Sequence, residues 1–341
     1  MISYARTGSP GPRQCYSRKH GKRRGSDTPR CSSTVQTFTE SAQTMWSEII
    51  NRRFLNIAHR GARSVAPENT MAAARKALEL GGDMWEIDVN RTADGKLIVI
   101  HDNTLERTSD AREIFPDRRP WFVHAFTLAE LRRLDFGSWF RAADPFGRIA
   151  AGEVSAAEAA AYRGEPVPLL REALEFTHCH SWLVNIEIKD LRGTPGDRTI
   201  VEEVVSLVEA MNMNERVLIS SFNHAYLDRV RRIAPRTAIG ALTNRPVANP
   251  LALLRKLGAA TFHPRAQFLR AKDVEKLRRE GCGVLVWVVN DAGTMRNLIA
   301  RRRVAGIFTD FPQVLAQVLR NPLVSTGGRF AHSPRHEGPN A

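Results

Sequence analysis

Eight apolar, strand-like runs alternate with helical patterns along most of the chain, and this alternation is the feature that most limits its fold. Apolar residues at helical spacing fill most of the gaps, as in ENTMAAARKALELGG after the first run. Parallel strands that are covered on both faces have this continuous apolar character. The pattern predicts a (β/α)8 barrel, of the TIM-barrel type, over residues 51–322, close to the ~250 residues such a barrel uses. The runs lie at residues 54–61, 84–89, 182–189, 216–222, 237–243, 259–264, 283–289 and 306–311.

The alternation breaks once, after the second run. NRTADGKLIVIHD (90–102) predicts a hairpin that turns at Asp94-Gly95, so that LIVIHD returns as an antiparallel strand above the barrel mouth. Residues 103–167 follow before the next helix, whereas an ordinary connection takes about 2–6 residues. We therefore expect a small insertion after the second barrel strand. A doubly wound open sheet is the alternative fold, but no strand is followed by the GxGxxG pattern common in that class.

Both ends of the chain differ in composition from the barrel segment. Residues 1–44 carry eight Lys and Arg against two acids and are rich in Ser, Gly and Pro. Such a segment buries too little apolar surface to order itself, so we predict a disordered basic extension over residues 1–50. It is either an organelle transit peptide or, as we favour, the product of a start assigned upstream of Met45. Residues 323–341 are predicted to form a polar tail.

Composition excludes several classes of protein. No run of about 18 apolar residues predicts a membrane-spanning helix, and the first segment has no secretory-signal core. The four cysteines show no paired spacing, so we expect neither disulfides nor a zinc site, and a cytoplasmic location fits. The formal charge of +14 invites a nucleic-acid interpretation. Outside the first segment, however, basic residues are mixed with acids on surface helices without interleaved aromatics, so we expect no nucleic-acid partner.

Charged and polar residues gather where the predicted strands end, which is where barrel enzymes place their catalytic groups. They are His59 and Arg60, Glu86 and Asp88, His101 and Asp102, and Glu187 and Lys189. Because side chains alternate along a strand, Glu86 and Asp88 share one face, as do Glu187 and Lys189. Three carboxylates at one mouth would repel each other unless a cation lay among them, and oxygen ligands suit Mg²⁺ or Ca²⁺. Isolated ion pairs are the alternative interpretation.

These residues belong to an ordered set of motifs. In this chain they are HRG at 59–61, PENT at 67–70, Glu86-x-Asp88, a Thr92 to Asp102 stretch ending in His-Asp, Glu187-x-Lys189, Ser221-Phe222, Trp287-x-x-Asn290 and Thr309-Asp-Phe-Pro312. The set resembles the glycerophosphodiester phosphodiesterases, and the match spans residues 54–312. The family's insertion between its second and third barrel strands also falls where residues 103–167 break the pattern.

The resemblance implies a role for each matched position. Glu86, Asp88 and Glu187 are expected to bind one divalent metal ion, Mg²⁺ or Ca²⁺. His59 and His101 are expected to form the acid/base pair, with the assignment of acid and base left open. Arg60 and Lys189 are placed to hold the phosphate. For Trp287 the residues themselves leave two roles open, packing or an apolar wall beside the substrate, and we favour the wall.

The implied reaction is metal-dependent hydrolysis of a small-molecule glycerophosphodiester to sn-glycerol 3-phosphate and an alcohol. A lysophospholipase D-type activity on lysolipids is the alternative, and it predicts an apolar groove on residues 103–167. A further alternative is a catalytically idle barrel that serves as a binding module. The alcohol headgroup and the oligomeric state do not follow from the sequence.

Five other residues are weaker candidates. Asn69 could cap a helix or line the site, and Asp310 is expected to orient a neighbour or to cap the last loop rather than to bind metal. His178 and His180 are expected to cap the C-terminal end of a helix, on the side of the barrel away from the site. His263 ends a strand and either lines the mouth or packs below it.

Overall fold

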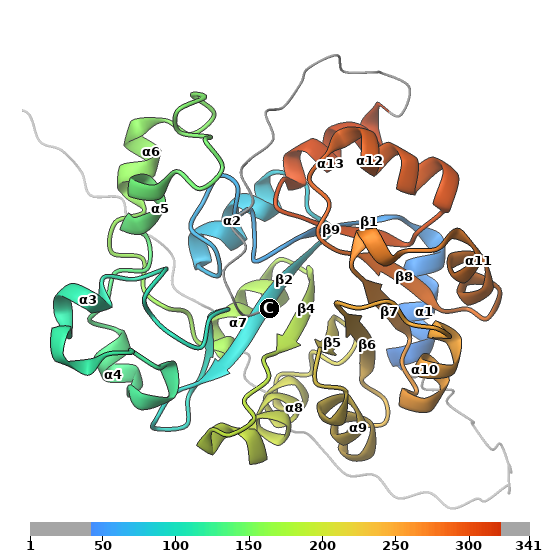
Figure 1. The fold of residues 1–341 in the computed structure, drawn as a ribbon, viewed down its shortest axis with the longest axis horizontal. Coiled ribbons are helices and arrows are strands. Elements are labelled where there is room, and N and C mark those ends of the chain that lie inside the picture. Colours follow the sequence, from blue (N-terminus) through green and yellow to red (C-terminus); the bar gives the residue numbers. More distant parts are fainter. Residues whose placement is uncertain (1–41, 322–341) are drawn as a thin grey trace, which may run out of the picture. The chain divides into compact units, whose positions relative to one another are not determined.

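The computed structural model describes residues 42–321, and within this range a nine-stranded sheet closes into a barrel (Figure 1). Eight strands are parallel neighbours, and β1 pairs with both β9 and β2 to close the ring. The predicted (β/α)8 barrel is therefore confirmed, and the alternative prediction of an open doubly wound sheet is wrong. The barrel strands are β1 (Leu55–Ala58), β2 (Met84–Arg91), β4 (Leu183–Ile188), β5 (Val217–Ser221), β6 (Ala238–Thr243), β7 (Thr261–Pro264), β8 (Gly283–Val286) and β9 (Gly306–Thr309).

Helices follow the strands and surround the barrel (Figure 1). The first, α2, begins where Thr70 caps it by accepting a hydrogen bond from the Ala73 backbone N–H at 3.2 Å. Its alanine face lies in the main core between strands and helices. The surrounding helices are α2 (Met71–Glu79), α7 (Leu170–Cys179), α8 (Ile200–Ala210), α9 (His224–Ile233), α10 (Pro250–Leu257), α11 (Ala271–Arg279), α12 (Ala292–Asn297) and α13 (Pro312–Arg320). Short 3-10 helices lie at Pro195–Arg198 and Ala266–Phe268, and a π-helix at Leu298–Arg302 follows α12.

A further helix, α1 (Ala42–Arg52), covers the end of the barrel where the strands begin. Trp46 is fully buried, and Ile50 packs so closely on Gly283 that a Cβ there would lie 2.6 Å from the Ile50 side chain. Both join the apolar cluster inside the barrel. The predicted disordered extension over residues 1–50 is thus wrong for residues 42–50, because their apolar side chains close the barrel. Its remainder and the predicted tail over 323–341 lie outside the described residues.

The insertion has its own small core. Strand β3 (Leu97–Val99) pairs antiparallel with the end of β2, as the hairpin at Asp94-Gly95 predicts. Short elements then follow to one side of the barrel (Figure 1). The first of them pack around Phe126 and Leu131, whereas Phe140 and Ala159, in the last two, join the main core. The short elements are α3 (Ala111–Ile114), Pro116–Arg118, Val123–Ala125, α4 (Leu128–Leu131), α5 (Ser138–Ala143) and α6 (Ala156–Ala161). Among the described helices, none combines the length and the hydropathy needed to cross a bilayer.

Candidate active site

Three carboxylates meet inside the barrel near the carboxyl ends of β2 and β4. Parallel pairing places Asp88 beside Glu187, and Glu86 lies two residues earlier on the same face of β2. One oxygen from each carboxylate lies within 4.8 Å of the other two, and all three residues are buried. The structure therefore brings Glu86, Asp88 and Glu187 together, as the alternation of side chains predicts.

The electrostatics of this triad favour a bound cation. Burial, together with the charges of Asp88 and Glu187, raises the pKa of Glu86 well above its usual range. Burial also raises the pKa of Glu187, although Lys189 opposes the shift. The Glu86 Oε1 atom is buried without a hydrogen-bond partner. A buried, unpaired carboxylate oxygen beside two further carboxylates is a donor set that fits Mg²⁺ or Ca²⁺.

Arg60 and Lys189 border the triad. The Arg60 backbone N–H donates to Glu86 Oε2 at 2.9 Å, and its Nε lies 3.3 Å from Asp88 Oδ2. Lys189 Nζ lies 3.2 Å from Asp88 Oδ1 and 2.7 Å from Glu187 Oε1. Arg60 adopts a left-handed backbone with φ of 56°, a conformation that costs energy for a large residue and that is concentrated at functional sites. Two positively charged side chains thus lie at the edge of the acidic triad.

His59 is held by the carboxylate of Asp310, the residue directly after the last barrel strand. Its Nδ1 atom lies 2.7 Å from Asp310 Oδ1, and Asn290 Nδ2 donates to the other Asp310 oxygen at 2.7 Å. Burial would raise the pKa of Asp310, but the charge of Arg63 and the contact with His59 lower it overall. Asp310 therefore orients a neighbour, as predicted.

His101 is held in the same manner by its sequence neighbour. Its Nδ1 atom lies 2.5 Å from Asp102 Oδ1. An ionised carboxylate only accepts hydrogen bonds, so each neutral histidine carries its proton on Nδ1 and has Nε2 as an acceptor. Burial lowers the pKa of both His59 and His101, and the Arg60 charge lowers both further. Two neutral imidazoles at this mouth can each accept a proton through Nε2.

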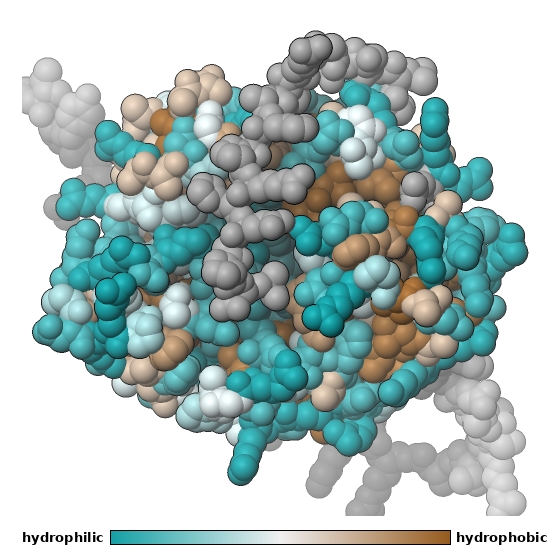
Figure 2. Space-filling model, viewed as in Figure 1, coloured by the Kyte–Doolittle hydropathy of each residue, from teal (hydrophilic) through white to brown (hydrophobic). Residues whose placement is uncertain are grey.

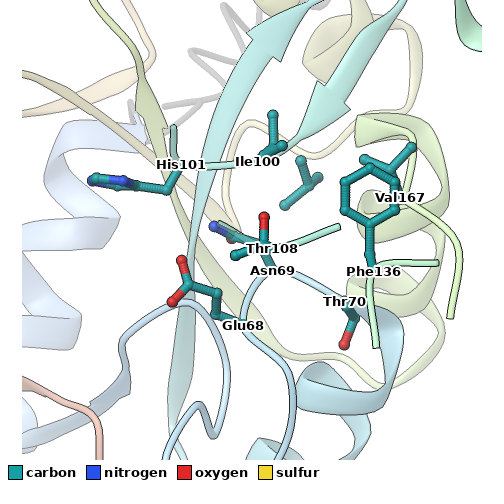
Figure 3. Close-up of a pocket in the computed structure, with 9 residues that line it drawn as sticks. Glu68, Asn69, Thr70, Ile100, His101, Thr108, Phe136 and Val167 are labelled. Atoms are coloured by element: carbon teal, nitrogen blue, oxygen red, sulfur yellow. The ribbon is translucent and has the colours of Figure 1, made fainter. Parts of the chain in front are cut away.

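The PENT segment contributes two residues whose roles the sequence left undefined. Asn69 donates from Nδ2 to Asp88 Oδ2 at 2.9 Å, while Thr70 caps the helix, so Asn69 belongs to the site. Glu68 is 5% exposed, and a hydrogen bond from Arg60 NH1 reaches its Oε1 at 2.9 Å. Figure 3 shows Glu68 and His101 on the side of Asn69 that faces away from Phe136 and Val167.

Sequence reasoning missed Arg63 and Arg107, which also pair with Glu68, at 2.9 and 2.6 Å. The signal was weak for both residues. Arg63 lies two residues beyond the HRG motif, and Arg107 lies in the irregular insertion, five residues after Asp102.

The remaining candidates lie at or away from the mouth. Trp287 is partly buried, donates from Nε1 to the His263 carbonyl at 2.9 Å, and packs edge-on against Phe222. His263 itself is fully buried, with Nε2 2.8 Å from Thr261 Oγ1, so it packs inside the barrel rather than lining the mouth. His180 caps the C-terminal end of α7, as predicted, and His178 lies in the last turn of that helix.

Comparison with known proteins agrees with this arrangement. Residues 59–314 match the model of the glycerophosphoryl diester phosphodiesterase family. A glycerophosphodiester phosphodiesterase of Caldanaerobacter subterraneus is 36% identical over 267 residues, covering 78% of this chain and 98% of that protein. One from Bacillus altitudinis is 32% identical over 259 residues, covering 75% of this chain and 94% of that protein.

A solved structure shows the same likeness. The Oleispira antarctica phosphodiesterase, determined in complex with the product sn-glycerol-3-phosphate, has a TM-score of 0.66 and 27% identity. The match covers 77% of this chain and 96% of that chain. With a matching family model, close relatives and a barrel that carries the family's motifs at its mouth, this chain belongs to the glycerophosphodiester phosphodiesterase family of phosphoric diester hydrolases.

Proposed function

We propose that the protein hydrolyses small glycerophosphodiesters to sn-glycerol 3-phosphate and an alcohol in a reaction that requires one divalent cation. The observation that carries the proposal is the arrangement at the mouth, where a buried acidic triad contacts the side chains of Arg60 and Lys189. Two histidines held by carboxylates lie at the same mouth. The Oleispira antarctica relative, which was solved with sn-glycerol-3-phosphate, supports this product.

In this proposal the histidines transfer protons, and the basic side chains of Arg60 and Lys189 bind the phosphate. One of His59 and His101 accepts a proton from the attacking oxygen through Nε2, while the other, once protonated, donates to the leaving alkoxide. Such transfers contribute typically about 10²–10⁴-fold each. Arg60 and Lys189 bind the phosphate oxygens and offset the charge that develops in the transition state. Trp287, together with Phe222, forms an apolar wall beside the substrate.

Glu86, Asp88 and Glu187 would hold the cation, which supplies Lewis-acid stabilisation of charge on the phosphate. We expect a thermal shift on adding Mg²⁺ or Ca²⁺ to EDTA-treated protein, because a ligand that binds the folded state stabilises it. Glu86→Gln should abolish this shift, whereas Glu209→Gln, at an exposed position at the end of α8, should leave it intact. Equal shifts in both variants would place the cation elsewhere.

Activity is tested with the purified full chain and a panel of glycerophosphodiesters with different headgroups. We expect release of sn-glycerol 3-phosphate that EDTA abolishes. His59→Ala and His101→Ala should each lower kcat by about 10²–10⁴-fold, while His178→Ala should not change it. Wild-type turnover in both site variants would exclude the acid/base assignment. The panel also identifies the preferred headgroup.

The lysolipid alternative is not favoured. Two of the relatives described above are named glycerophosphodiester phosphodiesterases, and the third is named a phosphodiesterase. None of the three is named a lysophospholipase. On the face shown in Figure 2, the surface over α3 and α4 is mainly hydrophilic and that over α5 and α6 is mixed, unlike the apolar groove that this activity predicts. Detergent-dispersed lysolipids belong in the same panel, and turnover of these in preference to soluble diesters would reverse this choice.

A further inference from the structure

The two histidines of the site differ in how firmly the fold supports them. His59 directly follows β1, its backbone N–H donates to the Thr309 carbonyl at 3.0 Å, and its side chain is 14% exposed. His101 lies beyond the short strand β3, in a bend rather than in a barrel strand, and its side chain is 30% exposed. Its orientation therefore depends more heavily on side-chain contacts than that of His59.

Asp102 alone does not supply a rigid support, because it is the next residue in the same bend and is itself 24% exposed. The contact that connects it to the rest of the molecule comes from Arg107 in the insertion. Arg107 donates from Nε to Asp102 Oδ2 at 2.7 Å and from NH2 to Oδ1 at 3.2 Å. Both oxygens of the carboxylate that holds His101 are thus bound by one guanidinium.

The adjacent edge of the same guanidinium, which shares NH2, binds Glu68. NH1 donates to Glu68 Oε2 at 3.0 Å, and NH2 donates to Oε1 at 2.6 Å. Glu68 is almost fully buried in the segment between β1 and α2, where Arg60 and Arg63 also bind it. Arg107 therefore links a partly exposed bend to one of the most enclosed carboxylates of the site.

The geometry requires arginine specifically. A guanidinium is planar and can form two parallel pairs of hydrogen bonds at once, whereas a lysine ammonium is a point charge without a fixed fork. The guanidinium carbon also lies 5.9 Å from the centre of the Trp139 ring in α5, a further contact from the insertion.

We propose that Arg107 is a positioning residue for His101: by bridging Glu68 and Asp102, it fixes the carboxylate that sets the proton position and the ring orientation of His101. This inference rests on the proposed function, in which His101 takes part in proton transfer. It also gives the insertion a role in catalysis, because the segment that interrupts the barrel supplies the residue that positions His101.

Kinetics of Arg107→Ala test the proposal. We expect kcat to fall by about 10²-fold, the loss that follows a displacement of about 1 Å, with KM little changed. The kcat of Arg107→Lys should be close to that of Arg107→Ala. Millimolar guanidinium should restore part of the activity of Arg107→Ala but not that of Arg107→Lys or the wild type. The same concentration of methylammonium serves as the control for ionic strength. Arg112→Ala is the matched control, because Arg112 is another arginine of the insertion that pairs with an acid of the insertion, Glu106, and it should retain wild-type kcat.

A double variant separates positioning from simple structural support. If Arg107 acts through Asp102, the loss in Arg107→Ala/Asp102→Asn should be close to that in Asp102→Asn alone. A residue that only stabilises the fold would lower the melting temperature, would not respond to guanidinium, and would give losses that multiply.

A readout independent of turnover keeps this proposal distinct from the proposed function. Nitrogen NMR of the histidine rings should show a single Nδ1-protonated form of His101 in the wild type and a mixture of tautomers in Arg107→Ala, with the signal assigned from His101→Gln. An inactive wild type with this NMR difference would refute the proposed function alone. Wild-type kcat in Arg107→Ala, multiplicative losses in the double variant, or an unchanged His101 signal would each overturn the role of Arg107.

Discussion

At the scale of single residues, Glu68 has the densest set of charged contacts of the site, with three arginines around one buried carboxylate. Burial alone would raise its pKa, but the charges of Arg63, Arg60 and Arg107 lower it well below the ordinary value of 4.5. In the unfolded chain those arginines are distant, so the carboxyl binds a proton more readily there. Between the folded and unfolded pKa values the unfolded state therefore binds more protons, and the free energy of unfolding rises with pH.

Glu68→Gln should reveal this contribution. At pH 7 we expect the free energy of unfolding to fall by about 3–5 kcal/mol, because the change removes the charge of a buried carboxylate from three ion pairs. As the pH falls below 4.5, the wild type should lose the Glu68 contribution progressively, so the two proteins should converge. Urea unfolding from pH 3 to pH 7 measures both effects. A constant difference across this range would mean that the carboxylate charge is not the cause.

At the scale of elements, helix α1 closes one end of the barrel with an apolar side chain. Trp46 is fully buried against the interior apolar cluster, to which the barrel strands contribute side chains. Trp46→Ala should lower the free energy of unfolding by about 3–5 kcal/mol, as is usual for removing a large aromatic side chain from a core. Phe122→Ala, at a position that is 41% exposed, should change it by no more than about 0.5 kcal/mol.

The same variant tests how separate the two ends of the barrel are. Trp46 lies where the strands begin, whereas the site lies where they end. Trp46→Ala should therefore keep wild-type kcat at temperatures at which it remains folded. Circular dichroism shows at which temperatures the variant is folded. A large loss of kcat at these temperatures would show that α1 influences the mouth.

Strands and their facing side chains could be predicted from the sequence, but contacts between loops could not. Glu86, Asp88 and Glu187 occupy regular strands, where alternation and register decide which side chains meet. Arg107 lies among short, irregular elements, and its direction follows from the packing of the whole insertion. Trp46 was assigned to a disordered segment because the residues before it are mostly polar. Its short apolar face is buried only by packing on the barrel, which the local sequence does not reveal.

At the scale of the whole molecule, positive charge outside the first 44 residues is distributed less evenly than we expected. Residues 216–321 carry 19 Lys and Arg against six Asp and Glu, whereas residues 42–215 carry 21 against 27. Since successive strand–helix units are neighbours around the barrel, the basic residues belong to one side of it, from β5 to α13 (Figure 1). We call residues 216–321 the basic half-barrel.

The basic half-barrel should dominate binding to polyanions. Arg232, Arg236 and Lys256 are exposed there, near the ends of α9 and α10. Changing all three to Gln removes three positive charges from a region where few acids offset them. Exposed charges act over a Debye length of about 10 Å at 0.1 M salt, so the local balance of charge matters more than the net charge of the chain.

The matched control removes the same number of charges from the acidic side. Arg141, Arg163 and Arg171 are also exposed but lie between residues 42 and 215, and their change to Gln gives a chain of equal net charge. We expect the first triple variant to elute from heparin at clearly lower salt than the wild type and the control to shift less, with kcat unchanged in both. The basic extension at the start of the chain is present in every protein compared, so it cannot cause a difference between the variants. Equal shifts would mean that retention follows net charge, and that the basic half-barrel does not act as a distinct surface.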